Sequence, residues 1–117
     1  MAYGAERLQA VDDLAEEGYY IDAMQILSIL SQSFKGTDVG DTAKAKHSSW
    51  KKDKMIKLEM MAETIVTKAE EFARLKQYKK AHAYLQTLIK QSKYAETKHL
   101  KKAEKLAEKY RRKMLPG

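Results

Sequence analysis

Cysteine is absent from this 117-residue chain, which also holds only one proline and five glycines. Without cysteine, disulfide bridges and thiolate metal sites are excluded. Because no Pro-rich linker divides the chain, we expect one domain over residues 1–117. No apolar run approaches 18 residues, so no transmembrane helix or membrane insertion is expected. No leader peptide is visible, which leaves the compartment open between the cytoplasm and, for a fragment without its leader, the periplasm.

Charge is plentiful and unevenly spread. Charged residues make up 33% of the chain and apolar residues 44%, too apolar a composition for a disordered protein. The net charge is +7, but residues 1–33 hold six acids and only Arg7, a net charge of −5. The remaining residues, 34–117, carry +12. This asymmetry indicates a partner of acidic character, or contact between opposite halves of neighbouring copies.

Apolar residues recur in steps of three and four, and β-branched residues lie within the same stripes, so we expect an all-α protein. The pattern predicts six helices at about 5–17, 20–33, 38–51, 54–76, 79–91 and 96–113. Gly18 ends the first, Thr37 or Asp38 begins the third and Asp53 begins the fourth. The third helix has the weakest signal, because Gly40 lies in its first turn. Two methionines, Met61 and Met114, are expected on the inner faces of the fourth and sixth helices.

One apolar pattern occurs twice in the sequence. Its first copy is Tyr20, Ala23, Leu27 and Leu30, and its second, 58 residues later, is Tyr78, Ala81, Leu85 and Leu88. After a two-residue shift, Phe34, Thr37 and Trp50 match Tyr94, Thr97 and Tyr110. The chain therefore divides into two repeats of three helices, at about 5–51 and 54–113. The alanine allows close approach of two helices, and the leucines form a shared core.

The repeated residues resemble the tetratricopeptide repeat, whose helical hairpin has a glycine, an aromatic, an alanine and leucines at this spacing. The Phe34 and Tyr94 junctions look like those of bacterial repeats from envelope and periplasmic proteins. The repeat departs from the family in its length, in its extra third helix, and in Lys76 at the usual glycine position. The resemblance implies a right-handed helical array or bundle that serves as a scaffold for protein–protein contact, without a cofactor.

No group of residues suggests catalysis or metal binding. His47, His82 and His99 lack the spacing of a helical metal site, and we expect them at the surface or half-buried. Adjacent carboxylates on a helix point in different directions, so they cannot act on one bond. Glycine-rich phosphate loops are missing. We therefore expect a protein that is not an enzyme and has no cofactor or metal.

A basic stripe is the main candidate for a binding surface. Its residues step by four and three along the last predicted helix: Lys98, Lys102, Lys105, Lys109 and Arg112. A second basic cluster surrounds the start of the fourth helix: Lys51, Lys52, Lys54 and Lys57. Such surfaces attract polyanions. A solvated polar face that binds nothing is the alternative, because Glu104 and Glu108 are interleaved with the stripe.

Two functions follow from these patterns. The first is a non-catalytic scaffold or adaptor whose partner is another protein, with an acidic segment as the expected ligand. The second is a domain that binds nucleic acid or another polyanion through the basic face of its last helix. Self-association is a further expectation, because the acidic first helix of one copy complements the basic last helix of another.

Overall fold

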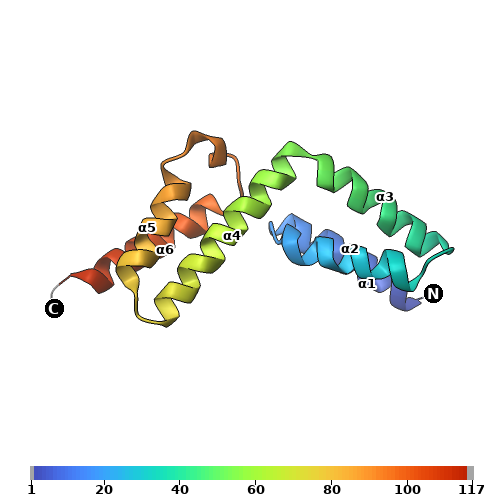
Figure 1. Cartoon of the computed structure of the whole chain (residues 1–117), viewed down its shortest axis with the longest axis horizontal. Helices are drawn as coiled ribbons and strands as arrows, with labels where there is room; N and C mark the ends of the chain where they lie inside the picture. The colour runs from blue at the N-terminus through green and yellow to red at the C-terminus, as the bar shows by residue number, and fades with distance from the viewer. Residues whose placement is uncertain (1, 116–117) are drawn as a thin grey trace. The chain divides into compact units, whose positions relative to one another are not determined.

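The computed structural model describes residues 2–115, and the side chains of residues 4–115. It confirms an all-α fold with six α-helices and no strand among those residues (Figure 1). The helices are α1 (Ala2–Glu16), α2 (Tyr20–Ser33), α3 (Asp38–Lys52), α4 (Lys54–Arg74), α5 (Tyr78–Ile89) and α6 (Leu100–Met114), with a short 3-10 turn, η1 (Ser92–Tyr94), before α6.

The chain forms two compact units, residues 1–60 (unit 1) and 61–117 (unit 2). The boundary falls within α4, so α1, α2 and α3 belong to unit 1, and α5 and α6 to unit 2. Each unit has its own buried apolar residues, and each is described below by itself.

In unit 1, α2 supplies most of the core. Its inward residues are Ala23, Leu27 and Leu30, which the repeated pattern predicts, together with Met24, and each is at most 9% exposed. Val11 of α1 and Ala43 of α3 join them, both fully buried. An ion pair of 2.7 Å between Lys46 of α3 and Asp12 of α1 crosses the surface of this core. The stripe of α2 thus packs between the other two helices.

In unit 2, the equivalent residues of α5 are buried. Ala81, Leu85 and Leu88 have no exposed surface, and their counterparts in α2 are at most 2% exposed. They share the interior with residues of α4, η1 and α6: Ala62, Val66, Ala69, Tyr94, Ala103, Ala107 and Tyr110. Lys102 of α6 lies 3.6 Å from Glu70 of α4, and this ion pair links the first and third helices of unit 2 as Lys46 and Asp12 link those of unit 1.

The two hairpin turns have the same geometry. After α1, Gly18 has φ 87°, its N–H donates to Ala15 O at 3.0 Å, and the next N–H donates to Leu14 O at 2.8 Å. After α4, Lys76 has φ 60° and both bonds recur 58 residues later, to Ala73 O and Phe72 O, at 2.9 Å each. Both turns are Schellman motifs. The glycine expected to end α1 is confirmed, and Lys76 adopts the conformation that glycine would prefer.

Replacing Lys76 by glycine is therefore expected to stabilise the protein by about 1 kcal/mol, because the left-handed conformation is strained for a residue with a Cβ. The midpoint of urea unfolding measures the change. The reverse change at the equivalent position, Gly18→Lys, is expected to cost at least as much, because Gly18 is also buried. Destabilisation by Lys76→Gly would show that the lysine side chain makes a contact that stabilises the protein by more than the strain that glycine relieves.

The junctions after the hairpins are also alike. The N–H and the hydroxyl of Thr37 both donate to Phe34 O, at 3.0 and 2.6 Å. Thr97 does the same to Tyr94 O, at 3.0 and 2.8 Å. Thr37 also caps α3, because its Oγ1 accepts the Gly40 N–H at 3.2 Å. The predicted caps of α3 and of α4, where Asp53 Oδ1 accepts the Ile56 N–H at 3.0 Å, are confirmed.

Each unit contains an aromatic pair that joins its second and third helices. The paired residues of one unit align with those of the other in the two sequence repeats. In unit 1, the rings of Tyr20 and Trp50 meet edge to face, with centroids 5.3 Å apart. In unit 2, Tyr78 and Tyr110 lie 5.9 Å apart with a tilt of 41°. The first ring of each pair begins the second helix of its unit, and the other lies near the end of the third. These pairs fix the two helices against each other.

Several expectations from the sequence are wrong. Met61 and Met114 are 46% and 39% exposed, although both lie near the apolar stripes of their helices. Helix α6 begins at Leu100 rather than 96, because the Thr97 bonds to Tyr94 O close a turn in that stretch. His99, expected at the surface or half-buried, is only 3% exposed.

Candidate anion-binding surface

The basic residues singled out in the sequence belong to different units. Four of them are exposed at the end of α3 and the start of α4 in unit 1: Lys51, Lys52, Lys54 and Lys57. The other five belong to unit 2: Lys98, Lys102, Lys105, Lys109 and Arg112. Each group is thus a local surface of its own unit.

The stripe of unit 2 is only partly an open basic face. Lys98 lies in the turn before α6, outside the helix, and Lys102 is half-buried in its pair with Glu70. Arg112 is exposed but pairs with Glu108 at 3.2 Å. Lys105 and Lys109 are exposed. Acidic side chains therefore offset the charge of part of the stripe, as the solvated-face alternative requires.

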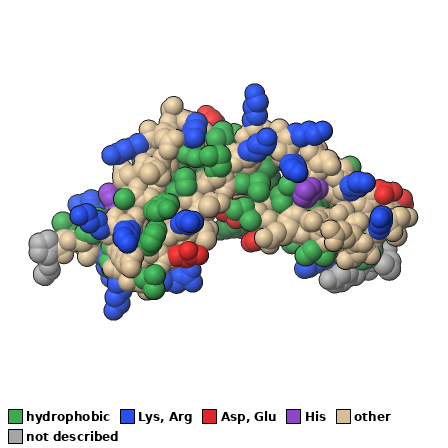
Figure 2. Space-filling model, in the orientation of Figure 1, with side chains coloured by type: hydrophobic (Ala, Val, Ile, Leu, Met, Phe, Trp, Pro, Cys, Tyr) green, Lys and Arg blue, Asp and Glu red, His purple; other side chains and the backbone are tan. Residues whose placement is uncertain are grey.

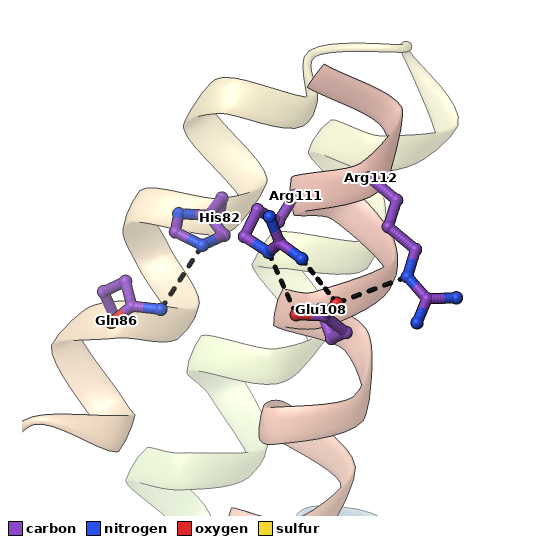
Figure 3. Close-up of polar contacts among 5 residues, drawn as sticks. All are labelled: His82, Gln86, Glu108, Arg111 and Arg112. Carbon is purple, nitrogen blue, oxygen red and sulfur yellow. Dashed lines mark hydrogen bonds and ion pairs between the residues drawn. The ribbon is translucent and has the colours of Figure 1, made fainter. Parts of the chain in front are cut away.

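Glu108 holds two arginines together near the end of α6 (Figure 3). Arg111 donates to both carboxylate oxygens, at 3.0 Å from Nε and 2.7 Å from Nη2, and Arg112 donates from Nε at 3.2 Å. Hydrogen bonding by Arg111, with its charge and the contribution of Arg112, lowers the pKa of Glu108 to about 2. The arginines near Glu108 are therefore partly neutralised at neutral pH.

An NMR titration of the glutamate carboxyl groups tests this arrangement. We expect Glu108 to titrate near pH 2, well below an ordinary glutamate. Because the folded pKa is lowered, any stability from the group is present above the ordinary pKa of about 4.3 and is lost as the pH falls through the folded value. Arg111→Gln should move the midpoint upward, and Arg74→Gln, on α4, should leave it unchanged. A midpoint near 4 in the unmodified protein would contradict the bidentate pairing.

A second basic surface lies where the start of α5 meets the end of α6. A groove of about 550 Å³ opens there, and four lysines from both segments line it: Lys76, Lys79, Lys80 and Lys113. The remaining lining residues are Gln77, Tyr78 and Met114, so no carboxylate contributes to it. Figure 2 shows Lys and Arg side chains gathered around this end of α6. We call this feature the lysine groove.

The lysines of the groove keep their charge available. Within residues 2–115, Lys76, Lys79 and Lys113 form no ion pair, and Lys80 Nζ lies 5.9 Å from the centre of the Phe72 ring. Four like charges around one depression create a positive potential that opposes folding and favours an anionic ligand. Apolar surface is part of the groove, because Met114, one of its lining residues, is 39% exposed. The groove thus suits carboxylates carried on a segment that also has apolar side chains.

Sequence inspection missed this groove. The signal was present in part, since three lysines fall within residues 76–80. Lys113 belongs with them only because α5 and α6 run antiparallel, which places the first turn of one beside the last turn of the other (Figure 1). The stripe of α6, in contrast, was found because its spacing is visible along one helix.

An adjoining groove of about 550 Å³ has mixed charge. Its lining combines Glu70 and Arg74 of α4 with Lys109 and Tyr110 of α6, and it shares Tyr78 with the lysine groove. Burial, followed by the negative charge of Glu70, raises the pKa of Tyr110. The Tyr110 phenol therefore stays neutral at physiological pH, and its ring packs on Tyr78.

No cluster of three or more His, Asp or Glu side chains suited to a metal occurs among the described residues. His82 contacts Gln86 at 3.4 Å on its own helix (Figure 3). Over the same part of the chain, every helix is too short or too polar to cross a bilayer.

Comparison with protein families, with curated proteins and with solved structures finds no match for this chain.

Proposed function

We propose that this chain is a non-catalytic helical-repeat module, similar to the tetratricopeptide type, that binds an acidic segment of a protein partner in the lysine groove. The observation that carries the proposal is the groove itself, with four lysines and no carboxylate among its lining residues. The repeated turns and junctions support the scaffold role, since stacked helical hairpins commonly present such surfaces to protein ligands.

The lining of the groove favours a peptide over a nucleic acid. Sequence-tolerant nucleic-acid binding relies on exposed aromatic rings that stack on bases. Here Tyr78 packs on Tyr110, and Tyr84, 36% exposed, packs on Phe72 with ring centroids 5.3 Å apart. Met114 instead offers an aliphatic contact beside the charges.

A polyanion remains the second candidate, because residues 61–117 carry 15 Lys and Arg against six Asp and Glu, a net charge of +9. The two candidates differ in how the binding affinity depends on salt concentration and on which lysine is replaced. Binding of a polyanion to a diffuse basic surface falls steeply with salt and depends little on which lysine is changed. Binding in the groove depends on its own four lysines.

The deciding experiment measures binding of a fluorescent peptide of alternating Glu and Leu, and of a single-stranded DNA of equal charge. In the double variant Lys79→Glu/Lys113→Glu, we expect peptide affinity to fall at least tenfold, because two attractions become repulsions. The matched control is Lys90→Glu/Lys101→Glu, which makes the same change of charge at exposed positions outside the groove.

The control is expected to lose less than about threefold, as for a distant surface charge. Equal losses in the two variants would reject the groove as the binding site. Tighter binding of the DNA, with equal losses in both variants, would support the polyanion instead.

A further inference from the structure

An acidic surface that complements the lysine groove occurs on the same chain. On α1 and the turn that follows it, Glu6, Asp13 and Glu17 are exposed and separated by seven and four residues, which places them on one face of the helix. They span about 16 Å at the helical rise of 1.5 Å per residue. Asp13 also accepts a hydrogen bond from Gln9 at 3.1 Å. We call these three residues the acidic stripe.

The two surfaces belong to units of opposite net charge. Residues 1–60 carry eight Lys and Arg against ten Asp and Glu, a net charge of −2, whereas residues 61–117 carry +9. Arg7 is the only cation in residues 1–33. In that acidic region Asp12 pairs with Lys46 of the same unit, whereas the three residues of the acidic stripe are exposed.

The repeat also favours a second copy as the occupant. Units of a repeat array bury their surfaces against neighbouring units. Helix α1 corresponds to α4, the larger part of which belongs to unit 2, since both end in the same Schellman turn. Within the chain, unit 1 is therefore followed by a unit of the same type. Unit 1 of a second copy is again a unit of that type.

We propose that the acidic stripe of one copy docks in the lysine groove of another, so that the protein assembles head to tail. This inference rests on the proposed function, because it names the ligand of the same groove. Each copy has one stripe and one groove, so the contact joins different surfaces and leaves one of each open. Such contacts produce open chains or rings rather than two-fold dimers.

The test uses the full-length chain and measures its mass by analytical ultracentrifugation over a range of concentrations. The unmodified protein is expected to form oligomers at 50 mM salt. At 500 mM salt the affinity between copies should fall at least tenfold, because screening shortens the range of the electrostatic attraction. One variant reverses the groove, with Lys76→Glu, Lys79→Glu and Lys113→Glu. The other reverses the stripe, with Glu6→Lys, Asp13→Lys and Glu17→Lys.

Each variant alone is expected to be monomeric, because its two surfaces then carry the same sign. Mixed in equal amounts, they regain opposite charges at every contact, and oligomers should return. This recovery also shows that both variants are folded. Lys90→Glu/Lys101→Glu should associate like the unmodified protein.

Self-assembly would be overturned if the protein stayed monomeric at low salt at concentrations up to about 100 times the Kd of the acidic peptide. It would also be overturned if either variant still associated alone, or if the mixture of the two stayed monomeric. If the acidic peptide still binds in the groove, the proposed function stands and only the second copy is rejected. If the peptide also fails to bind, both proposals are rejected.

Discussion

Replacing Gly40 by alanine is expected to destabilise the protein by about 3 kcal/mol, although in an exposed helix the same change stabilises by about 1 kcal/mol. Gly40 is buried in the first turn of α3, and an added Cβ would lie 2.6 Å from the carbonyl carbon of Phe34 and 3.2 Å from Lys35 N. These are backbone atoms, which cannot turn aside as a side chain can. The connection from α2 to α3 must therefore shift.

That shift would also disturb the cap of α3, because the Gly40 N–H donates to Thr37 Oγ1. Urea unfolding followed by circular dichroism measures the free energy. The control Thr42→Ala, exposed in the same helix, is expected to change it by less than about 0.5 kcal/mol. An increase in stability for Gly40→Ala would show that helix propensity dominates and that the carbonyl of Phe34 moves at little cost.

Replacing Leu85 by alanine is expected to cost about 3 kcal/mol, with the effect concentrated in unit 2. Leu85 has no exposed surface, so its loss leaves a cavity among the helices around α5. Because residues 1–60 have a separate core, hydrogen exchange should quicken mainly for amides in residues 61–115. Exchange measured by mass spectrometry on proteolytic fragments resolves the two units.

Leu27→Ala is the matched change in unit 1, since Leu27 is equally buried at the equivalent position of α2. It should reverse the pattern and quicken exchange in residues 2–60. If both substitutions accelerated exchange equally over the whole chain, the two units would unfold as one cooperative structure.

Local sequence signals were sufficient for the six helices and for most of their ends, although α6 begins four residues later than predicted. Gly18, Thr37 and Asp53 lie at helix ends, where the conformation of one or two residues determines whether the helix begins or stops. Their effects depend little on distant parts of the chain. The repeated apolar pattern predicted the buried residues of α2 and α5 because one helix face supplies most of each core. The tetratricopeptide resemblance stays a prediction.

Features that depend on packing were missed. Gly40 looked like a weakness of α3, whereas its missing side chain is what lets the carbonyl of Phe34 approach. Helical periodicity also predicted that Met61 and Met114 are buried. The apolar face that periodicity defines is wider than the part of the face that a neighbouring helix covers. The lysine groove needs α5 and α6 to be antiparallel, and no spacing along one helix reveals that pairing.

The matching turns and junctions define two places where the gene can be recombined. The segments 14–37 and 72–97 begin with the same pair of Schellman bonds and end with the same threonine bonds to an aromatic carbonyl. The two-residue difference in their lengths falls between Ile89 and Tyr94, where η1 forms. We expect an exchange at these points to keep the backbone hydrogen bonds at both ends, so that chimaeras of the two segments can be built without new connections.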